Sequence, residues 1–164
     1  MIRKFGEKYP KISNSAIVDD TALIIGDVFI DDFANIWPHA LLRATDEKIF
    51  VGKKSAILDK SFIESPEEVY IGEGSIISHC SIVHGSRIGK NVLVGIGAIL
   101  LEVEIGDNCI IASGSVVKEG VEENSFVAGI PGKVIREVRK EEIEKNKKIC
   151  EEMYNKAKLL KEND

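Results

Sequence analysis

The stretch IGEGSIISHCSIVHGSRIGKNVLVGIGAIL, residues 71–100, carries an aliphatic side chain at almost every sixth position. The same spacing runs from Ile12 to Val117, with occasional longer or shorter steps. Its members are Ile12, Val18, Ile24, Ile30, Ile36, Leu42, Val51, Ile57, Ile63, Ile71, Ile77, Val83, Ile88, Val94, Leu100, Ile105, Ile111 and Val117. Four positions after most of them stands an alanine, serine or cysteine. A period of six fits neither the 3.6 of an α-helix nor the two of a flat strand.

A six-residue period is typical of a parallel β-helix built from hexapeptides. Each hexapeptide forms a short strand and a turn, and three of them close a triangular coil that stacks on the next at about 4.8 Å. All irregular steps follow a third hexapeptide, so one vertex absorbs the length variation, with loops at 43–50 and 64–70 side by side. A sandwich or barrel would not hold one period over this length. We therefore predict an all-β solenoid of about six triangular coils.

Composition limits the function classes. The 164 residues suffice for one domain with a continuous core. No apolar run is long enough to span a bilayer, and the start, MIRKFGEKYP, lacks the apolar segment of a signal peptide. The net charge of −5 argues against a nucleic-acid surface. Three cysteines without a CxxC pair indicate reduced thiols, so we expect a cytoplasmic protein. From the charge and the lack of a long apolar run, we expect neither a nucleic acid nor a membrane as partner.

The C-terminal segment differs from the repeats. After GIPG at 129–132, residues 133–164 combine spaced apolar residues with many i,i+4 charge pairs, which predicts an amphipathic helix. We expect repeats over 1–132 and a helix over 133–164 of the same domain. About 25 helical residues span roughly 37 Å, enough to run along the whole solenoid. A helix that binds a membrane surface or a partner is the alternative.

Coil stacking places chemically active residues in columns. Arg43, Glu64 and His84 occupy one vertex in successive coils, and Asp59 lies directly over His79 on a second vertex. His79 and His84 are separated by five extended residues, about 16 Å of chain. Zinc takes nitrogen ligands at about 2.1 Å, so one chain can hardly bring both rings to one ion. A shared ion would need Glu64 and His84 from one chain and His79 from its neighbour, in a closed ring that a triangular solenoid suggests is threefold.

Simpler interpretations remain open for the same residues. Glu64 and His84 can form a stacked ion pair, and a lone surface histidine is usually only polar surface. His39 lies away from the first column and is expected to be such a bystander. Cys80 stands beside His79, but nothing in the sequence indicates the lowered pKa that a nucleophilic thiol needs.

At these residues the chain resembles the γ-class carbonic anhydrase-like family of hexapeptide-repeat proteins. The resemblance runs from about Ile12 to Val138 and rests on IGDVFIDDFANIWPHALLR at 25–43, IGEGSIISHCSIVHGSRIG at 71–89, GIGA at 95–98 and GIPGK at 129–133. It implies a left-handed β-helix, a C-terminal helix packed alongside, and a homotrimer. It also implies a divalent ion, zinc most often but also iron or cobalt, held between subunits by three histidines. His79 and His84 align with the last two.

The chain departs from the family at the first metal ligand. In SAILDKSFIE, at 55–64, the position of the first histidine is Glu64, and a family glutamine is replaced by Leu58. Arg43 and Asp59 are retained, and the resemblance implies that these two residues pair across the subunit boundary and organise the catalytic pocket. Two histidines and a carboxylate still suit zinc or iron. An anionic ligand makes the ion a weaker Lewis acid, so hydration of CO2 to bicarbonate is expected to be reduced or absent.

Three functions therefore compete. The first is a trimeric, metal-binding carbonic anhydrase-like protein, a lyase if it is active at all. The second is a hexapeptide acyltransferase that binds acetyl-CoA between solenoids, although no histidine on a long excursion loop is evident. The third is a non-catalytic trimer, a scaffold or carrier that has lost its metal.

Overall fold

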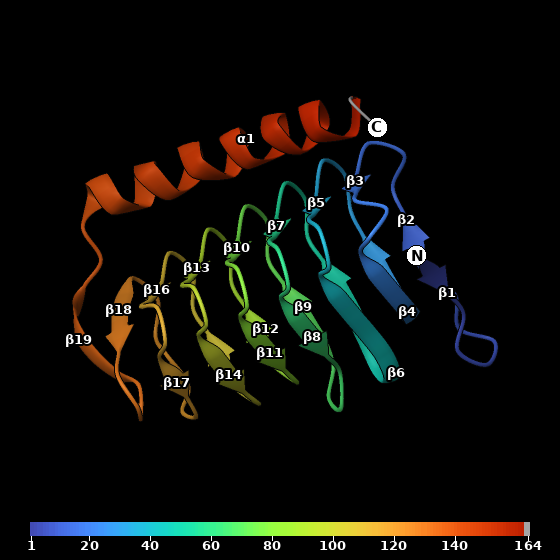
Figure 1. Ribbon diagram of the computed structural model, residues 1–164. Coiled ribbons are helices and arrows are strands. Elements are labelled where there is room, and N and C mark those ends of the chain that lie inside the picture. The colour runs from blue at the N-terminus through green and yellow to red at the C-terminus, as the bar shows by residue number, and fades with distance from the viewer. Residues whose placement is uncertain (163–164) are drawn as a thin grey trace.

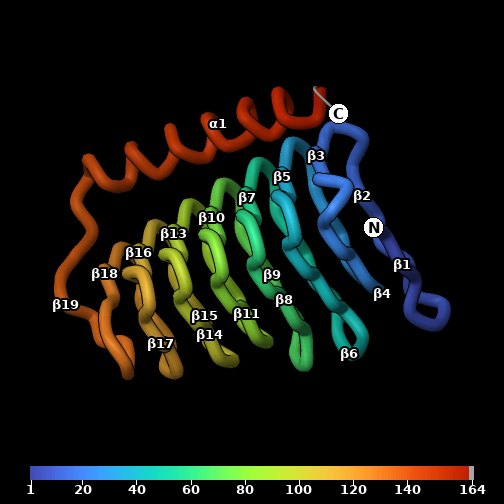
Figure 2. Tube along the Cα trace, viewed as in Figure 1, coloured from blue at the N-terminus to red at the C-terminus, as the bar shows by residue number. Residues whose placement is uncertain are grey.

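The computed structural model describes residues 1–162 and is a parallel β-solenoid of about seven turns with one C-terminal helix. Figures 1 and 2 show the coils stacked side by side, with the helix lying along them. The predicted fold class is confirmed. An additional turn arises at the N-terminus, where residues ahead of the repeat pair with Ile24 and Ile25.

The coils form three faces. The first carries β3 (Ile17–Val18), β5 (Asn35–Ile36), β7 (Ala56–Ile57), β10 (Ile76–Ile77), β13 (Leu93–Val94), β16 (Ile110–Ile111), β18 (Ser125–Ala128) and β19 (Lys133–Glu137). The second carries β1 (Ile2–Arg3), β8 (Phe62–Glu64), β11 (Ile82–His84), β14 (Ile99–Leu101) and β17 (Val116–Val117). The third carries β2 (Lys11–Ile12), β9 (Val69–Ile71), β12 (Arg87–Ile88) and β15 (Glu104–Ile105). The long strands β4 (Leu23–Ile30) and β6 (Leu41–Val51) belong to both the second and the third face.

The core is the column of predicted aliphatic positions. From Ile24 to Val117 these side chains are almost completely buried, whereas Ile12 and Val18 at the open first coils are only partly so. The small positions are buried with them, and the hydroxyls of Ser55, Ser61, Ser75 and Ser81 donate to backbone carbonyl groups of the next coil. Ser61 Oγ donates to Ser78 O at 2.9 Å, and Ser81 Oγ donates to Gly95 O at 2.9 Å. The hydroxyls therefore link successive coils instead of leaving buried donors unpaired.

Length variation is confined to the predicted vertex, but one of its two excursions is not a loop. Residues 43–50 belong to the single strand β6, whose pairing with β4 shifts register between Gly26 and Val28. The excess residues bulge outward from this strand. The second excursion is a short loop after β8, and the two lie side by side because Glu47 N donates to Ser65 O at 3.0 Å.

The C-terminal helix begins later than the sequence predicts. Residues 133–137 form β19, which pairs antiparallel with β18, and helix α1 spans Lys140–Glu162. The expected helix extended to residue 164, and its last two residues lie outside the described part. The β-branched Val134 and Ile135 favour the strand. The helix itself starts at a cap, where the Glu142 carboxylate accepts from Arg139 N at 2.9 Å.

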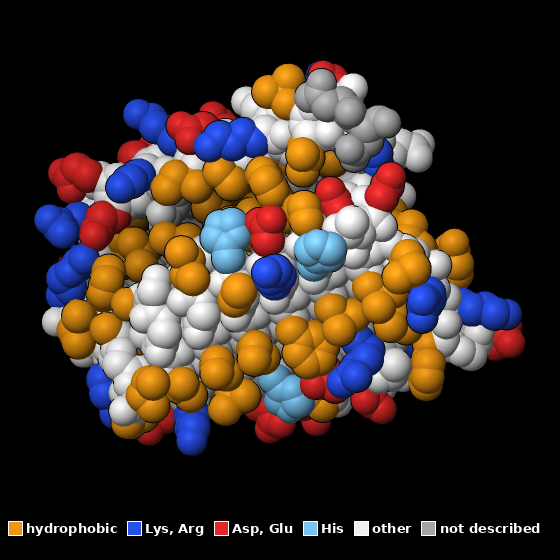
Figure 3. Space-filling view, viewed as in Figure 1, with side chains coloured by type: hydrophobic (Ala, Val, Ile, Leu, Met, Phe, Trp, Pro, Cys, Tyr) orange, Lys and Arg blue, Asp and Glu red, His pale blue; other side chains and the backbone are white. Residues whose placement is uncertain are grey.

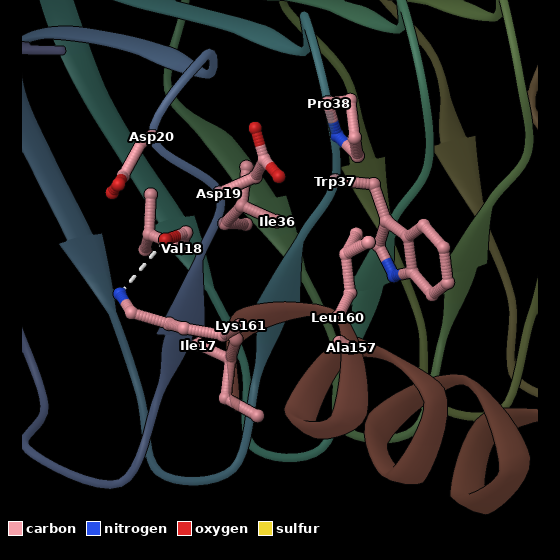
Figure 4. A pocket seen from close by; sticks show the side chains of 10 residues that line it. All are labelled: Ile17, Val18, Asp19, Asp20, Ile36, Trp37, Pro38, Ala157, Leu160 and Lys161. Atoms are coloured by element: carbon pink, nitrogen blue, oxygen red, sulfur yellow. Dashed lines mark hydrogen bonds between the residues drawn. The ribbon is translucent and has the colours of Figure 1, made fainter. Parts of the chain in front are cut away.

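Helix α1 covers the first face and runs back from the last coils to the first (Figure 1). Ile149, Cys150 and Met153 pack against an apolar cluster on β7, β10 and neighbouring coils. Near its end, Lys161 Nζ donates to Val18 O at 3.1 Å, and only about 10 Å³ of space remains there (Figure 4). No helix within residues 1–162 is long and apolar enough to cross a membrane.

The junction between β19 and α1 should respond to acid. The Arg136 guanidinium binds the Glu142 carboxylate through two contacts of 2.8 Å and lowers its pKa to about 2. The ion pair stabilises the folded chain fully when the pH is above 4.5, the ordinary pKa of a glutamate, and this stabilisation is lost as the pH falls towards 2. We expect a carbon-13 NMR titration of Glu142 to give a midpoint near 2, and Arg136→Gln to raise it towards 4.5. Lys118→Gln removes the same charge at a distant position and should leave the Glu142 midpoint near 2. A Glu142 midpoint that stays near 2 in Arg136→Gln would contradict the assignment.

Candidate functional site

The first predicted column is present at the ends of β6, β8 and β11. Parallel pairing aligns Arg43 with Glu64 and Glu64 with His84 in successive coils. Glu64 Oε1 is ion-paired with Arg43, and Glu64 Oε2 lies 3.3 Å from His84 Nδ1. The carboxylate therefore stands between a guanidinium and an imidazole. All three side chains are partly exposed at the vertex, where a second molecule could reach them.

The charge state of Glu64 follows from this arrangement. The hydrogen bond from Arg43 is the main cause that lowers the pKa of the Glu64 carboxyl, and His84 adds to it, while burial opposes both. Glu64 is therefore an anion at neutral pH. The Arg43 guanidinium also lies 5.3 Å from the centre of the Phe62 ring, which fixes its plane. Its Nε is buried and has no hydrogen-bond partner within residues 1–162.

The second predicted column is also present, on the turns after β7 and β10. His79 Nδ1 lies 2.9 Å from Asp59 Oδ2. With the proton on Nδ1, His79 donates to the carboxylate and keeps the lone pair of Nε2 free. A carboxylate behind a histidine in this way fixes the tautomer and orients the ring, as it does in many metal sites. Asp59 thus holds the ring of the partly exposed His79 in one orientation.

The two columns stay apart within one chain. No group of three or more His, Cys, Asp or Glu side chains that could hold a metal ion occurs within residues 1–162. In the view of Figure 3, some histidine side chains lie close below the helix, and another lies at the lower edge of the molecule, well separated from them. His39 belongs to neither pair; its backbone N–H donates to Thr21 Oγ1 at 3.1 Å in a turn. Cys80 is exposed and free.

Sequence reasoning missed one charged neighbour. Glu102 Oε1 lies 3.6 Å from His84 Nε2, so His84 stands between two carboxylates. Strand pairing aligns His84 with Leu101, and Glu102 follows one residue later with φ 50°. The only signal was an acidic residue at a shortened step of the repeat.

An outward apolar strip was also missed. The second face carries a continuous row of partly exposed aliphatic and aromatic side chains that are paired in register from coil to coil. The strip consists of Leu23, Leu41, Phe62, Ile82, Ile99 and Val116. It lies between the vertex of Asp59 and His79 and the vertex of Glu64 and His84, and the helix covers a different face. Its sequence signal is an apolar residue, aliphatic or aromatic, directly before the inward one in each third hexapeptide.

Comparisons with known proteins agree with this fold. The family described as "Bacterial transferase hexapeptide (six repeats)" matches residues 85–119. The Methanocaldococcus jannaschii protein named "Probable carbonic anhydrase" is 38% identical over 137 residues, covering 80% of this chain and 86% of that protein. A carbonic anhydrase of Geobacillus kaustophilus is 32% identical over 166 residues, covering 98% and 91%. A solved hexapeptide transferase family protein from Anaplasma phagocytophilum has a TM-score of 0.93 at 29% identity, covering 96% of each chain.

The identity and coverage of the two carbonic anhydrase relatives define the class. The chain belongs to the γ-class carbonic anhydrase-like family of hexapeptide-repeat proteins.

Proposed function

We propose that the protein is a γ-carbonic anhydrase-like homotrimer with a divalent-metal site between subunits and with reduced or absent CO2 hydration. Glu64 and His84 of one chain and His79 of its neighbour would hold the ion, with zinc as the first choice and iron or cobalt as alternatives. One observation carries the proposal. The two half-sites flank an uncovered apolar strip, so a contact that buries the strip would bring them together.

The strip supports assembly on physical grounds. Six outward apolar side chains in one continuous row gain free energy when a second surface removes them from water. The vertices on its two sides carry different residues, so a contact between copies joins unlike edges. Such a heterologous contact is stable when it closes into a ring. Three copies of a triangular solenoid would close with their equivalent faces towards the centre.

The residues present fit a metal ion. His79 offers a free Nε2 with its ring held by Asp59, and Glu64 offers an anionic oxygen. When bound, the ion would supply the Lewis acidity on which CO2 hydration depends. Arg43 positions the Glu64 carboxylate, and the exposed end of its guanidinium would face Asp59 of a neighbouring chain. Arg43 and Asp59 therefore serve the site mainly by positioning its donors.

The same contacts explain why hydration should be weak. A carboxylate ligand lowers the effective charge of the ion, and the Arg43 guanidinium competes with the ion for that carboxylate. Leu58, which replaces a glutamine of the family, is buried with Ala56, Ile76 and Cys150 beneath α1. It has no donor with which to orient a substrate. The proposed site thus has enough ligands for an ion but lacks the neutral third ligand and the side-chain donor that would activate and orient the reactants.

Assembly has a direct test. The intact chain should have a solution mass of about 54 kDa, three times its 18.1 kDa. Ile82→Glu should convert it to a monomer, because it places a charge in the centre of the strip. Val134→Glu, at an exposed residue of β19, should leave the mass unchanged. A monomeric unmodified chain at micromolar concentration would contradict the trimer.

Metal content tests the site separately. Protein purified without oxygen should hold about one divalent ion per chain, and Glu64→His should raise both zinc affinity and CO2 hydration, because a neutral imidazole restores charge to the ion. His79→Ala or His84→Ala should abolish binding, whereas His39→Ala should retain it. Less than about a tenth of an ion per chain, measured by elemental analysis, would favour a non-catalytic scaffold or carrier.

The hexapeptide transferase neighbour makes a transferase the second candidate, and we consider it in the form of acyl transfer from acetyl-CoA. The residues argue against it, because all three histidines lie on short turns or strand ends instead of on a long loop. We therefore expect CoA to leave the melting temperature of the trimer unchanged in a thermal-shift assay. A saturable increase with CoA, absent with adenosine, would favour the acyltransferase over the metal protein.

A further inference from the structure

A vertex column on the side of α1 away from the histidines contains a gap. Its residues share a left-handed backbone and stack through hydrogen bonds such as Asn91 N to Glu73 O at 2.9 Å. The column consists of Phe33, Lys54, Gly74, Asn91, Asn108 and Asn124. Gly74 interrupts the row of side chains, and a Cβ atom placed there would meet nothing within 4 Å. The gap opens into a cavity of about 490 Å³ between the solenoid and α1, named here the Gly74 cavity.

The amides above the gap form a ladder that ends at the cavity. Asn108 Nδ2 donates to Asn124 Oδ1 at 3.0 Å, and Asn91 Nδ2 donates to Asn108 Oδ1 at 3.1 Å. Asn91 Nδ2 is occupied by Asn108, so Oδ1 is the amide atom left over on Asn91, which lines the cavity together with Gly74. Asn91 is 8% exposed, and its Oδ1 has no hydrogen-bond partner within residues 1–162. A buried acceptor without a donor is costly, so this atom marks a missing partner.

One other buried amide within residues 1–162 lacks a partner, and it does not supply this donor. Asn146 Nδ2, on α1, is also buried and unpaired, but Asn146 does not line the Gly74 cavity. The donor is therefore expected from a molecule that enters the cavity.

The walls indicate what kind of molecule fits. Phe33 and Tyr154 meet edge to face, with ring centres 5.8 Å apart, and the Tyr154 hydroxyl donates to Ser15 O at 3.2 Å. Cys150 Sγ donates to Lys54 O at 2.8 Å, and burial raises the pKa of this thiol to about 11, so it adds a neutral surface. The charged lining residues are of both signs: Lys54, Lys90, Lys147, Glu73 and Glu151. Fixed aromatic walls without a dominant charge favour a planar, uncharged ring.

We propose that the Gly74 cavity binds an uncharged planar aromatic molecule that donates an N–H or O–H to Asn91 Oδ1. The volume lies in the range of small-molecule sites, roughly 300–1,000 Å³. The space of Figure 4, near the C-terminal end of α1, barely holds one water between closely packed side chains. The cavity is distinct from the half-sites at Glu64 and His79, so this inference does not depend on the proposed metal function.

Indole and benzofuran, similar in shape, form a matched pair of probes because only indole has an N–H. We expect saturable nitrogen-15 shift changes in the full chain on adding indole, centred on Gly74, Asn91 and Tyr154. Benzofuran should bind about tenfold more weakly, since it leaves Asn91 Oδ1 unpaired. Equal affinity for the two probes, shifts centred elsewhere, or no saturable shift at the solubility limit of indole would overturn the proposal.

A substitution can fill the gap without a ligand. Gly74→Asn should extend the ladder by donating to Asn91 Oδ1, because asparagine tolerates the φ of +69°. It should raise the melting temperature and abolish indole binding. Gly114→Asn is the matched control, with φ +71° and open space on another vertex, and it should bind indole as the unmodified protein does. A folded Gly74→Asn variant that binds indole normally would also overturn the assignment. If the variant does not fold, the comparison of indole with benzofuran on the unmodified protein still tests the proposal.

Discussion

The structure depends on the register of hydrogen bonds between coils. Leu58 N donates to Ile77 O at 2.8 Å and Ser78 N donates to Val94 O at 2.9 Å, and the same contact recurs along the solenoid. Each hexapeptide position is thereby held over its equivalent in the previous coil. Inward positions become one aliphatic core, and outward positions become columns. The Arg43–Glu64–His84 series, the Asp59–His79 pair and the apolar strip are all such columns.

Columns explain both the stability and the chemistry of the surface. On the third face, Phe29, Phe50 and Tyr70 stack with ring centres 5.2 and 5.1 Å apart, and Arg87 lies 5.3 Å from the centre of the Tyr70 ring. On the first vertex the same stacking gives the Arg43–Glu64–His84 series. A solenoid places like positions close together but keeps its vertices apart. Groups on different vertices can act together only when two chains meet, so the function proposed above depends on assembly.

Much of this could be predicted from the sequence, because the repeat fixes register. The alignment of Glu64 with His84 and the contact of Asp59 with His79 both follow from counting hexapeptides. Features that depend on breaks in the repeat could not be predicted in this way. The β-branched Val134 and Ile135 give only a weak preference for a strand, and the pairing of residues 133–137 with β18 decides between strand and helix. Glu102 was missed because a shortened step moves it next to His84, and the Gly74 cavity depends on where α1 packs.

The central claim is that His79 and His84 work together only across a subunit boundary. A chain with His79→Cys and His84→Cys, in a Cys80→Ser background, would carry two exposed thiols, since Cys109 and Cys150 are buried. Treatment with a short bis-maleimide should then link chains into covalent dimers and trimers on a denaturing gel, and either single variant should not. A bridge formed within one chain, or no bridge at all, would contradict the account.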